Sequence, residues 1–322
     1  MERKLASVQR IVELKHIEGA DSIEAARVNG WWVVVKLGEF NVGDLCIYLE
    51  IDSWVPYELA PFLSRGKEPR EFDGVKGERL RTVKLRGQLS QGLILPFVGD
   101  GAEGDDLTEA MGIKKWEKPT PACLSGQMKG NFPSFIPKTD QERVQNLPEV
   151  FDDVQSEYEV TVKLDGSSMT VYWHEGVFGV CSRNVDLKMD QEGNTFVDTA
   201  KRVFDSCDFS GLAIQGELMG PGIQGNREKL SSHEFFVFDI WVIPEQRYYT
   251  PDERREFCKV MGLQEVPYLE TVRLSNMDLE SLLQYAEGPS LNNPVREGVV
   301  FKRRDGKFSF KAISNKFLLG DE

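Results

Sequence analysis

The chain has 322 residues, of which 40% are apolar and six are tryptophan, and its formal net charge is −13. This length allows two domains with packed cores, and the apolar content excludes a disordered chain. The excess of negative charge excludes a protein that holds nucleic acid by bulk positive charge, but it leaves room for a local basic patch. No apolar run approaches the ~18 residues of a membrane-spanning helix, so we expect no membrane partner.

The five cysteines are odd in number and scattered, and no Cys-x-x-Cys motif occurs. A disulfide framework and a structural zinc site are therefore not expected. Unpaired thiols fit a reducing compartment, and we expect a cytoplasmic protein. The sequence carries no signal for the oligomeric state, and we take a monomer as the working expectation.

Residues 1–118 are expected to form one domain. Four strand-like segments, separated by turn residues, follow one another at residues 5–14, 22–28, 31–35 and 45–49. Asn29-Gly30 predicts a two-residue hairpin turn, and a further pair of strands is expected near residues 79–95. About five short strands joined by turns indicate a small β-barrel or sandwich.

Basic side chains concentrate between Arg65 and Arg86, where eight of them outnumber four acidic ones. One interpretation is a solvated loop without a specific partner. The other is a patch that follows the phosphates of a nucleic acid on an oligonucleotide-binding (OB) barrel. The second interpretation makes four side chains candidate nucleic-acid contacts, namely Arg79, Arg81, Lys84 and Arg86.

Residues 119–137 contain four prolines and two glycines with little periodicity, which predicts a linker. The next segment, Thr139-Asp-Gln-Glu142, has the pattern of a capping box. It predicts a short helix through about Leu147 that carries Arg143.

Residues 138–322 are expected to form a second domain. Strand-like segments outnumber helical ones, and the helices do not alternate strictly with the strands. That pattern indicates an α+β fold of antiparallel sheets with flanking helices. One of those helices begins at the capping box Thr250-Pro-Asp-Glu253 and ends before Gly262.

Lys163 stands at the end of an alternating, strand-like segment, Tyr158-Glu-Val-Thr-Val-Lys163. Asp165-Gly166 then predicts a turn, and residues 169–173 predict another strand. Taken alone, Lys163 and Asp165 are interpreted most simply as a solvated ion pair.

Gly220-Pro-Gly-Ile-Gln-Gly225 matches the Gly-x-Gly-x-x-Gly pattern of dinucleotide-binding folds. About nine residues separate Gly225 from the next strand, too few for the crossover helix that such a fold requires. We therefore expect a mobile loop here. No P-loop motif occurs in the sequence.

Charged residues lie on or beside many of the predicted strands of the second domain: Lys163, Asp165, Arg183, Glu217, Asp239, Glu297, Lys302 and Lys311. Each alone is interpreted most simply as a surface charge. Glu217, however, lies between Gly216 and Leu218, and Glu297 opens an otherwise apolar strand. Carboxylates in such surroundings usually have a partner.

Six short motifs follow one another along this domain: Lys163-Leu-Asp-Gly166, Ser182-Arg-Asn184, Gly216-Glu-Leu218, Phe235-Phe-Val-Phe-Asp-Ile240, Glu297-Gly-Val-Val-Phe-Lys302 and Ser309-Phe-Lys311. Their order resembles the collinear motifs of covalent nucleotidyltransferases, the superfamily of ATP-dependent DNA and RNA ligases and mRNA capping enzymes. The third and fourth motifs are most similar to those of RNA ligases.

The order of the domains indicates which family within this superfamily the chain resembles most. DNA ligases and capping enzymes carry their OB barrel after the transferase domain, whereas the expected barrel here precedes it. This order, with residues 135–147 ahead of the lysine motif, resembles the Deinococcus-type RNA ligases, the fifth RNA ligase clade. It implies an N-terminal OB-like β-barrel followed by a C-terminal ligase-type nucleotidyltransferase domain.

The resemblance implies an ATP-dependent ligase that joins a 3′-OH RNA end to a 5′-phosphate end, at nicks in duplexes. Lys163 is implied to form a lysyl-AMP adduct, for which its amine must lose a proton despite an ordinary pKa of about 10.4. Positive charge from Lys302 and Lys311 is implied to assist that loss. The implied nucleotide contacts are Val162, Arg183, Glu217, Phe238, Glu297, Lys302, Lys311 and Arg143. The carboxylates implied to hold Mg²⁺ or Mn²⁺, through water, are Asp165, Glu217 and Glu297.

The last motif departs from the Lys-x-Lys of many relatives, because Ser309 stands where the first lysine is expected. Lys307 and Lys316 are the candidates to replace it. Two other functions stay open from the sequence. One is a capping guanylyltransferase, against which the domain order weighs, and the other is a non-catalytic OB-fold RNA-binding protein.

Overall fold

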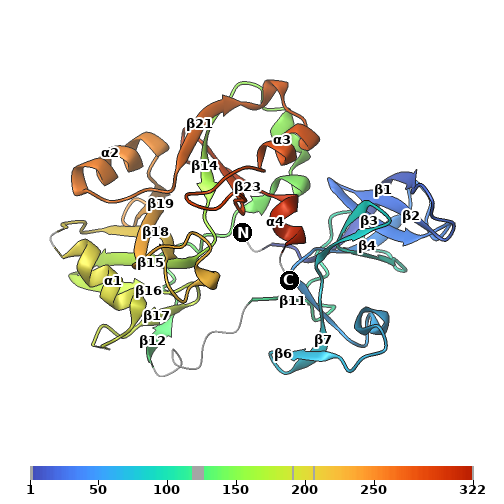
Figure 1. The fold of residues 1–322 in the computed structure, drawn as a ribbon, viewed down its shortest axis with the longest axis horizontal. Coiled ribbons are helices and arrows are strands. Elements are labelled where there is room, and N and C mark those ends of the chain that lie inside the picture. The colour runs from blue at the N-terminus through green and yellow to red at the C-terminus, as the bar shows by residue number, and fades with distance from the viewer. Residues whose placement is uncertain (1–2, 118–126, 191, 206, 321–322) are drawn as a thin grey trace. The chain divides into compact units, whose positions relative to one another are not determined.

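The computed structural model describes residues 3–117, 127–190, 192–205 and 207–320 (Figure 1). The chain divides into two compact units. Among the described residues, the N-terminal unit contains residues 3–117, 145–148 and 318–320, and the C-terminal unit contains the remainder. No helix in these ranges is long and apolar enough to span a bilayer.

The N-terminal unit is built on a five-stranded antiparallel sheet in the order β10-β4-β1-β2-β3. The strands are β1 (Ala6–His16), β2 (Ile23–Val28), β3 (Trp31–Lys36), β4 (Leu45–Leu49) and β10 (Leu93–Pro96). The long β1 pairs with β4 along its first half and with β2 along its second, and a bulge between Ile11 and Glu13 bends it. The bend brings the edge strands β3 and β10 into contact, which curls the sheet into a barrel.

The predicted hairpin at Asn29-Gly30 is confirmed. Asn29 has a φ of 50°, the left-handed conformation that such turns require, and Val28 pairs with Trp31 across it. The Trp31 side chain is fully buried in the barrel, and its Nε1 donates a hydrogen bond of 2.6 Å to Asn146 Oδ1. This contact explains why residues 145–148 belong to the N-terminal unit.

A second sheet and a separate hairpin complete this unit. The sheet has the order β11-β5-β7-β6, with β5 (Ser53–Pro56), β6 (Arg70–Phe72), β7 (Val75–Arg79) and β11 (Lys114–Lys115). The hairpin joins β8 (Thr82–Leu85) to β9 (Gln88–Gln91). Its turn residues Arg86 and Gly87 both have positive φ, as a two-residue type I′ turn requires.

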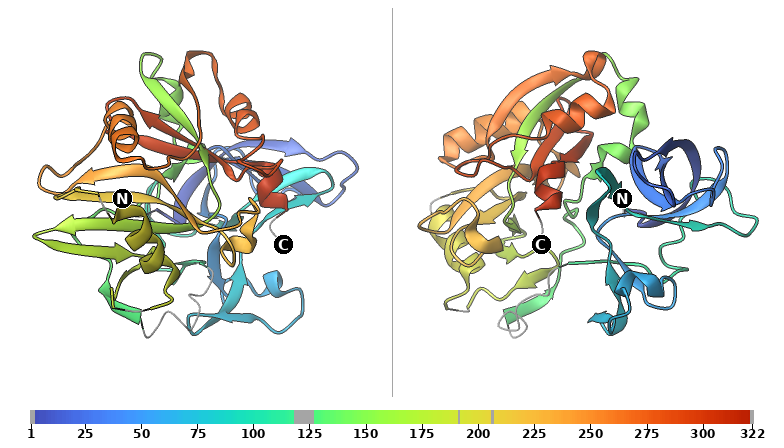
Figure 2. Two further views of the ribbon diagram at one scale, coloured as in Figure 1. Left: turned by 60° about the vertical axis from the view of Figure 1, so that its left-hand side comes forward. Right: turned by 45° about the vertical axis from the view of Figure 1, so that its right-hand side comes forward.

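The C-terminal unit contains two sheets (Figures 1 and 2). The larger has seven strands in the order β12-β17-β16-β15-β18-β19-β20. They are β12 (Met128–Asn131), β15 (Ser167–His174), β16 (Val177–Cys181), β17 (Val185–Leu187), β18 (Leu212–Met219), β19 (Glu234–Val242) and β20 (Arg247–Tyr248). Helices α1 (Thr195–Phe204) and α2 (Pro251–Met261) pack against this sheet and cover its largest apolar cluster.

The smaller sheet has five strands in the order β13-β23-β22-β14-β21. They are β13 (Glu142–Arg143), β14 (Glu157–Lys163), β21 (Tyr268–Arg273), β22 (Gly298–Arg303) and β23 (Ser309–Ile313), with helix α3 (Leu279–Tyr285) against β23 and α4 (Asn315–Leu319) after it. Phe301 and Phe310 stack on neighbouring strands of this sheet with ring centroids 4.8 Å apart.

The sheets and helices of the two units together confirm the predicted α+β class with an N-terminal barrel.

One prediction around residues 119–147 is wrong. Residues 119–126 of the expected linker lie outside the described part of the chain, and its later residues Met128–Asn131 form β12, which pairs with β17, so the linker stays a prediction. The expected helix at Thr139 is wrong, because Glu142 and Arg143 form β13, which pairs in parallel with β23. A short 3₁₀ turn, Val144–Asn146, follows it. The capping box at Thr250 is confirmed, and α2 ends at Gly262 with a φ of 67°.

Candidate active site

Lys163 lies where the chain passes from one sheet of the C-terminal unit to the other. It is the last residue of β14 in the five-stranded sheet, and β15 of the seven-stranded sheet begins only four residues later, at Ser167. Gly166 makes this crossing possible, because a Cβ atom there would come within 2.3 Å of Met219 Sδ and 2.5 Å of Leu218 O. The sequence therefore sets the candidate nucleophile at the junction of two sheets.

Glu297 is the direct partner of Lys163. Lys163 pairs with Gly298 in the β14–β22 ladder, so the preceding residue, Glu297, reaches the lysine, and Lys163 Nζ donates to Glu297 Oε2 at 2.7 Å. The lysine side chain is 25% exposed and the glutamate 16%. The pair is thus half-buried and still open to a ligand.

Three carboxylates surround the lysine: Asp165, Glu217 and Glu297. Burial alone would lower the pKa of Lys163, but the charges of these carboxylates outweigh it and hold the pKa above its ordinary value. Burial raises the pKa of Glu217 to about 7; the other two carboxylates add to this effect, and Lys163 opposes it. Without a ligand, the lysine is therefore held in its charged, non-nucleophilic form.

The residues predicted to hold an adenine base lie close to Lys163. Phe238 packs on an apolar cluster that includes Val162, Met219 and Val266. The Val162 amide donates to the Pro267 carbonyl at 2.9 Å, so this N–H is already bonded within the protein. These side chains offer a flat aromatic ring beside a buried strand, which suits a planar base.

Lys302 occupies a different place from the one expected. In the ladder, Gly298 faces Lys163 while Lys302 faces Glu159, four residues away along the strand, or roughly 13 Å. Lys302 is buried against Asp239, and its Nζ also donates to the Phe238 carbonyl at 2.7 Å. The prediction that Lys302 supplies positive charge to Lys163 is therefore not supported.

A buried ionic network surrounds Lys302 and ties the two sheets together. Arg254 of α2 donates to both carboxylate oxygens of Glu159, at 2.8 and 3.0 Å, and to the Phe238 carbonyl at 3.3 Å. Burial lowers the pKa of Lys302, and Asp239 opposes that effect. The sequence pattern marked Asp239 and Lys302 separately, but their pairing across two sheets was not visible in it.

Asp140 contacts two of the predicted residues, Lys311 and Arg183. Its carboxylate accepts from Lys311 Nζ at 2.9 Å and lies 3.9 Å from Arg183 Nη2. Arg143 is buried and pairs with Lys311 in the β13–β23 ladder. Sequence analysis missed Asp140, because only the parallel pairing of β13 with β23 reveals its position.

Neither candidate for the missing lysine of the last motif joins this group. Lys307 lies in the exposed turn between β22 and β23, at the end of these strands opposite Glu297. Lys316 forms an ion pair of 2.7 Å with Glu287 instead.

The predicted nucleic-acid contacts of the N-terminal unit divide into two kinds. Arg79 is held inside the unit by a 2.7 Å ion pair with Asp52, and its guanidinium lies 3.9 Å from the centre of the Trp116 ring. Arg81, Lys84 and Arg86 are exposed along the β8–β9 hairpin. Of the four, the latter three are therefore the ones exposed to solvent.

The carboxylates around Lys163 suit a hard divalent cation in their chemistry. Within the described ranges, however, no three His, Cys, Asp or Glu side chains are close enough together to ligate a metal directly. Asp165, Glu217 and Glu297 thus fit a metal held through water rather than a closed protein cage.

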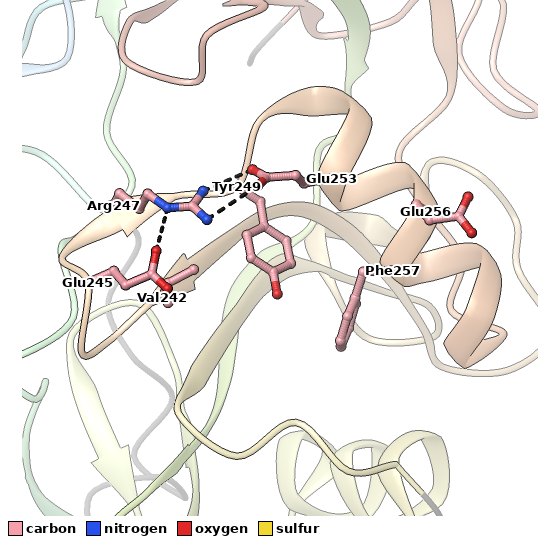
Figure 3. Close-up of a pocket in the computed structure, with 7 residues that line it drawn as sticks. All are labelled: Val242, Glu245, Arg247, Tyr249, Glu253, Glu256 and Phe257. Carbon is pink, nitrogen blue, oxygen red and sulfur yellow. Dashed lines mark hydrogen bonds and ion pairs between the residues drawn. The ribbon is translucent and has the colours of Figure 1, made fainter.

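A separate pocket of about 380 Å³ opens between the β19–β20 hairpin and α2, lined by Val242, Glu245, Arg247, Tyr249, Glu253, Glu256 and Phe257 (Figure 3). Arg247 points across it and is paired with Glu245 at 2.6 Å and with Glu253 at 2.9 Å. No predicted site residue lines this pocket, so it is distinct from the surroundings of Lys163.

Comparisons with known proteins match both units of the chain. A family model described as an OB-fold domain matches residues 5–97, and one described as RNA ligase matches residues 156–313. The comparison with curated proteins gives no match.

Among solved structures, the chain is similar to the Naegleria gruberi RNA ligase. A variant of that protein with AMP and Mn is 45% identical over 98% of both chains, with a TM-score of 0.91. A variant with ATP and Mn has the same identity and coverage and a TM-score of 0.90, and the protein with PPi is 46% identical over 98% of both chains, also at 0.90.

These matches span both units and favour neither a capping enzyme nor a non-catalytic RNA-binding protein. The narrower Deinococcus-type clade stays a prediction. The chain pairs a lysine with a glutamate at the junction of two sheets and carries an OB-fold domain before them. It is also 45% identical to a solved RNA ligase over almost its whole length. We conclude that the chain belongs to the RNA ligase family.

Proposed function

We propose that this RNA ligase uses ATP to join a 3′-OH RNA end to a 5′-phosphate end, and that its substrate is a nick in a duplex. The observation that carries the proposal is the Lys163–Glu297 pair in a chain so similar to a ligase solved with ATP, AMP and PPi. We also infer a monomer in a reducing, cytoplasmic compartment, which fits the free thiols of Cys46, Cys181, Cys207 and Cys258.

In the first step, the Lys163 amine attacks the α-phosphate of ATP. A nitrogen–phosphorus bond forms, the bond to the β-phosphate oxygen breaks, and pyrophosphate leaves. Lys163 must give up a proton first, because the three nearby carboxylates hold it charged. A divalent cation bound near Asp165, Glu217 and Glu297 would neutralise these carboxylates and the phosphates.

Other residues bind and orient the nucleotide in this proposal. The Phe238 ring stacks on adenine, and the Val162 carbonyl accepts from its amino group, since the Val162 amide is already bonded to Pro267. Glu217 and Arg183 contact the ribose. Lys311 and Arg143 face the leaving phosphates, which compete with Asp140 for the Lys311 ammonium group.

The remaining steps transfer AMP and seal the strand. An oxygen of the RNA 5′-phosphate attacks the adenylate phosphorus, the bond to nitrogen breaks, and Lys163 regains a proton. The 3′-OH then attacks the 5′-phosphate phosphorus and loses its proton as AMP leaves. Exposed cations of the β8–β9 hairpin, Arg81, Lys84 and Arg86, hold the backbone of the duplex.

Intact-mass measurement tests this proposal. After incubation with ATP and Mg²⁺ or Mn²⁺, the chain should gain the mass of one AMP, and Lys163→Ala should gain none. GTP in place of ATP should give no adduct. The adenylylated chain should seal a nicked duplex with a 3′-OH RNA end faster than it joins free single strands, and equal rates would disprove nick preference.

A further inference from the structure

The glycine-rich segment between β18 and β19 is a structured loop rather than an unrestrained one. Its Asn226 side chain both accepts from the Leu230 amide at 3.0 Å and donates to the Leu230 carbonyl at 2.9 Å. Gln224, Asn226 and Lys229 all have positive φ, a conformation that is costly for residues with side chains. Such strain persists only where surrounding contacts enforce it, so the loop is expected to have a task.

The loop is bonded to the segment that precedes Glu297. Glu228, which is buried, accepts from the Asn292 amide at 2.6 Å, and Asn292 Nδ2 donates to the Glu228 carbonyl at 3.0 Å. Asn293 Nδ2 donates to the Arg227 carbonyl at 3.2 Å. We call residues 226–230 and 292–295 together the clasp. It links the β18–β19 connection of one sheet to the residues just before β22 of the other.

Arg227 is the member of the clasp that reaches toward Lys163. Its Nη2 donates to the Val295 carbonyl at 3.2 Å, and its guanidinium lies 4.6 Å from the centre of the Phe317 ring. Its Nε lies 4.0 Å from Asp165 Oδ2, two residues beyond the nucleophile. One side chain thus contacts the crossing between the sheets and the segment that ends in Glu297.

Arg296 and the backbone of Glu297 are held as well. Arg296 is buried and donates to the last carbonyls of α3, to Ala286 at 3.0 Å and to Tyr285 at 2.6 Å. The Glu297 carbonyl accepts from the Ser314 amide at 2.8 Å. These bonds and the clasp together hold the backbone that carries the Glu297 carboxylate.

We propose that Arg227 is a positioning residue for adenylylation, which holds Asp165 and Glu297 in register with Lys163 through the clasp. The proposal rests on the proposed function for its kinetic consequence. Arginine suits this task because a planar guanidinium can stack on Phe317, donate to Val295 and face Asp165 at once, whereas a lysine ammonium cannot do all three. The glycines at 220, 222 and 225 then serve to shape this loop rather than to bind a dinucleotide.

The test compares Arg227→Ala, Arg227→Lys and Asn293→Ala with the parent chain. Arg247→Ala is the matched control, since it removes another partly exposed, ion-paired arginine, on the edge strand β20. The first readout is amide hydrogen exchange in the ligand-free chain, at Val295, Arg296 and Gly298. The second is the single-turnover rate of lysyl-AMP formation, with the ATP concentration that gives half the maximal rate.

Arg227→Ala should raise exchange at these amides and slow lysyl-AMP formation about 10- to 100-fold, as expected for misplaced catalytic groups. The half-saturating ATP concentration should change less than about threefold, because the base and ribose contacts are untouched. Arg227→Lys should recover only part of the rate. Asn293→Ala should act in the same direction more weakly, and its effect should not add fully to that of Arg227→Ala.

Unchanged exchange and rate in Arg227→Ala would overturn the proposal. A loss of rate that follows the melting temperature across all the variants, including Arg247→Ala, would also overturn it, because the arginine would then only stabilise the fold. If the parent chain forms no lysyl-AMP, the proposed function fails instead. The exchange measurement still decides whether Arg227 orders the Glu297 segment.

Discussion

At the scale of single residues, nearby carboxylates keep the amine of Lys163, the proposed nucleophile, charged in the ligand-free chain. Lys163 faces three carboxylates, and the nearest, Glu297, is within 2.7 Å. In the proposed reaction, activation of this amine depends on cations that neutralise the carboxylates. The same carboxylates would then have opposite effects on Lys163 before and after metal and nucleotide bind.

Glu297→Gln should show both effects. In the ligand-free chain, loss of the negative charge should lower the pKa of Lys163, and an amine-directed reagent should label Lys163 faster at pH 8. Lysyl-AMP formation should nevertheless fall by about two orders of magnitude, since a preorganised carboxylate is lost. Glu287→Gln, which removes only the partner of Lys316, is the control and should change neither. Slower labelling in Glu297→Gln would contradict this account.

Glu217 should give the ligand-free chain a pH-dependent stability. Burial raises its pKa from 4.5 to about 7 in the folded chain, so between these values the folded state keeps a proton that the unfolded state releases. Its contribution to the free energy of unfolding therefore falls as pH rises through this window, and the loss is complete above pH 7.

Glu217→Gln removes this titration. Without added metal or nucleotide, it should raise the melting temperature at pH 8 by several degrees relative to the parent and change it much less at pH 5. Thermal unfolding at the two pH values measures the difference. An equal shift at both would show that the effect comes from packing and not from the proton.

At the scale of elements, the sequence correctly predicted the features that depend on residues close together in the chain. The hairpin at Asn29-Gly30 and the capping box at Thr250 depend on neighbouring residues, and the structure has both. The box at Thr139 has similar letters, yet Glu142 and Arg143 form a strand, because pairing with β23 prevails over helix propensity. The arrangement around Asp140, and the clasp, likewise depend on contacts between residues far apart in sequence.

The pairing of Lys302 shows the same limit of sequence-based prediction. The motif indicated that this lysine matters, but its partner, Asp239, lies on the other sheet. Its role as a link between sheets could not be predicted without knowing which strands face each other.

Lys302→Met should therefore destabilise the chain. It leaves the buried Asp239 carboxylate without its cation, which typically costs about 3–5 kcal/mol. Urea unfolding measures this loss, and adding Asp239→Asn should restore part of it. Lys307→Met, in an exposed turn, should cost much less. The half-saturating ATP concentration should also rise in Lys302→Met, since the Phe238 carbonyl loses the nearer of its two side-chain donors.

At the scale of the whole molecule, the net charge of −13 does not distinguish basic residues that stabilise the fold from those that are exposed. Of the four side chains predicted to contact nucleic acid, the three exposed ones, Arg81, Lys84 and Arg86, lie along the β8–β9 hairpin, whereas Arg79 contacts Asp52 and Trp116. Composition excluded binding by bulk charge, but only the structure separates the structural arginine from the exposed ones.

Lys84→Ala with Arg86→Ala should weaken binding to a nicked duplex and leave lysyl-AMP formation unchanged. Each lost phosphate contact should reduce the slope of log affinity against log salt by about 0.9 on B-form DNA. Arg79→Ala should instead lower the melting temperature, because it breaks an ion pair and a ring contact. An unaltered salt slope in the double variant would remove the hairpin from the nucleic-acid interface.

The N-terminal unit is not one continuous stretch of chain. The indole of Trp31 is satisfied by Asn146, and Asn146 also donates to Glu50, so the barrel incorporates a short piece of chain from beyond the residues that separate the units in sequence. The barrel is therefore difficult to exchange between proteins as a single continuous segment, in evolution or in engineering. Consider a chimera with a single junction before residue 127, which joins the barrel of a relative to the C-terminal unit of this chain. Its Asn146 would come from this chain and would face a barrel with which it does not normally pair. Transplants that carry residues 145–148 together with the barrel should express and fold, while single-splice chimeras should require compensating changes around Trp31.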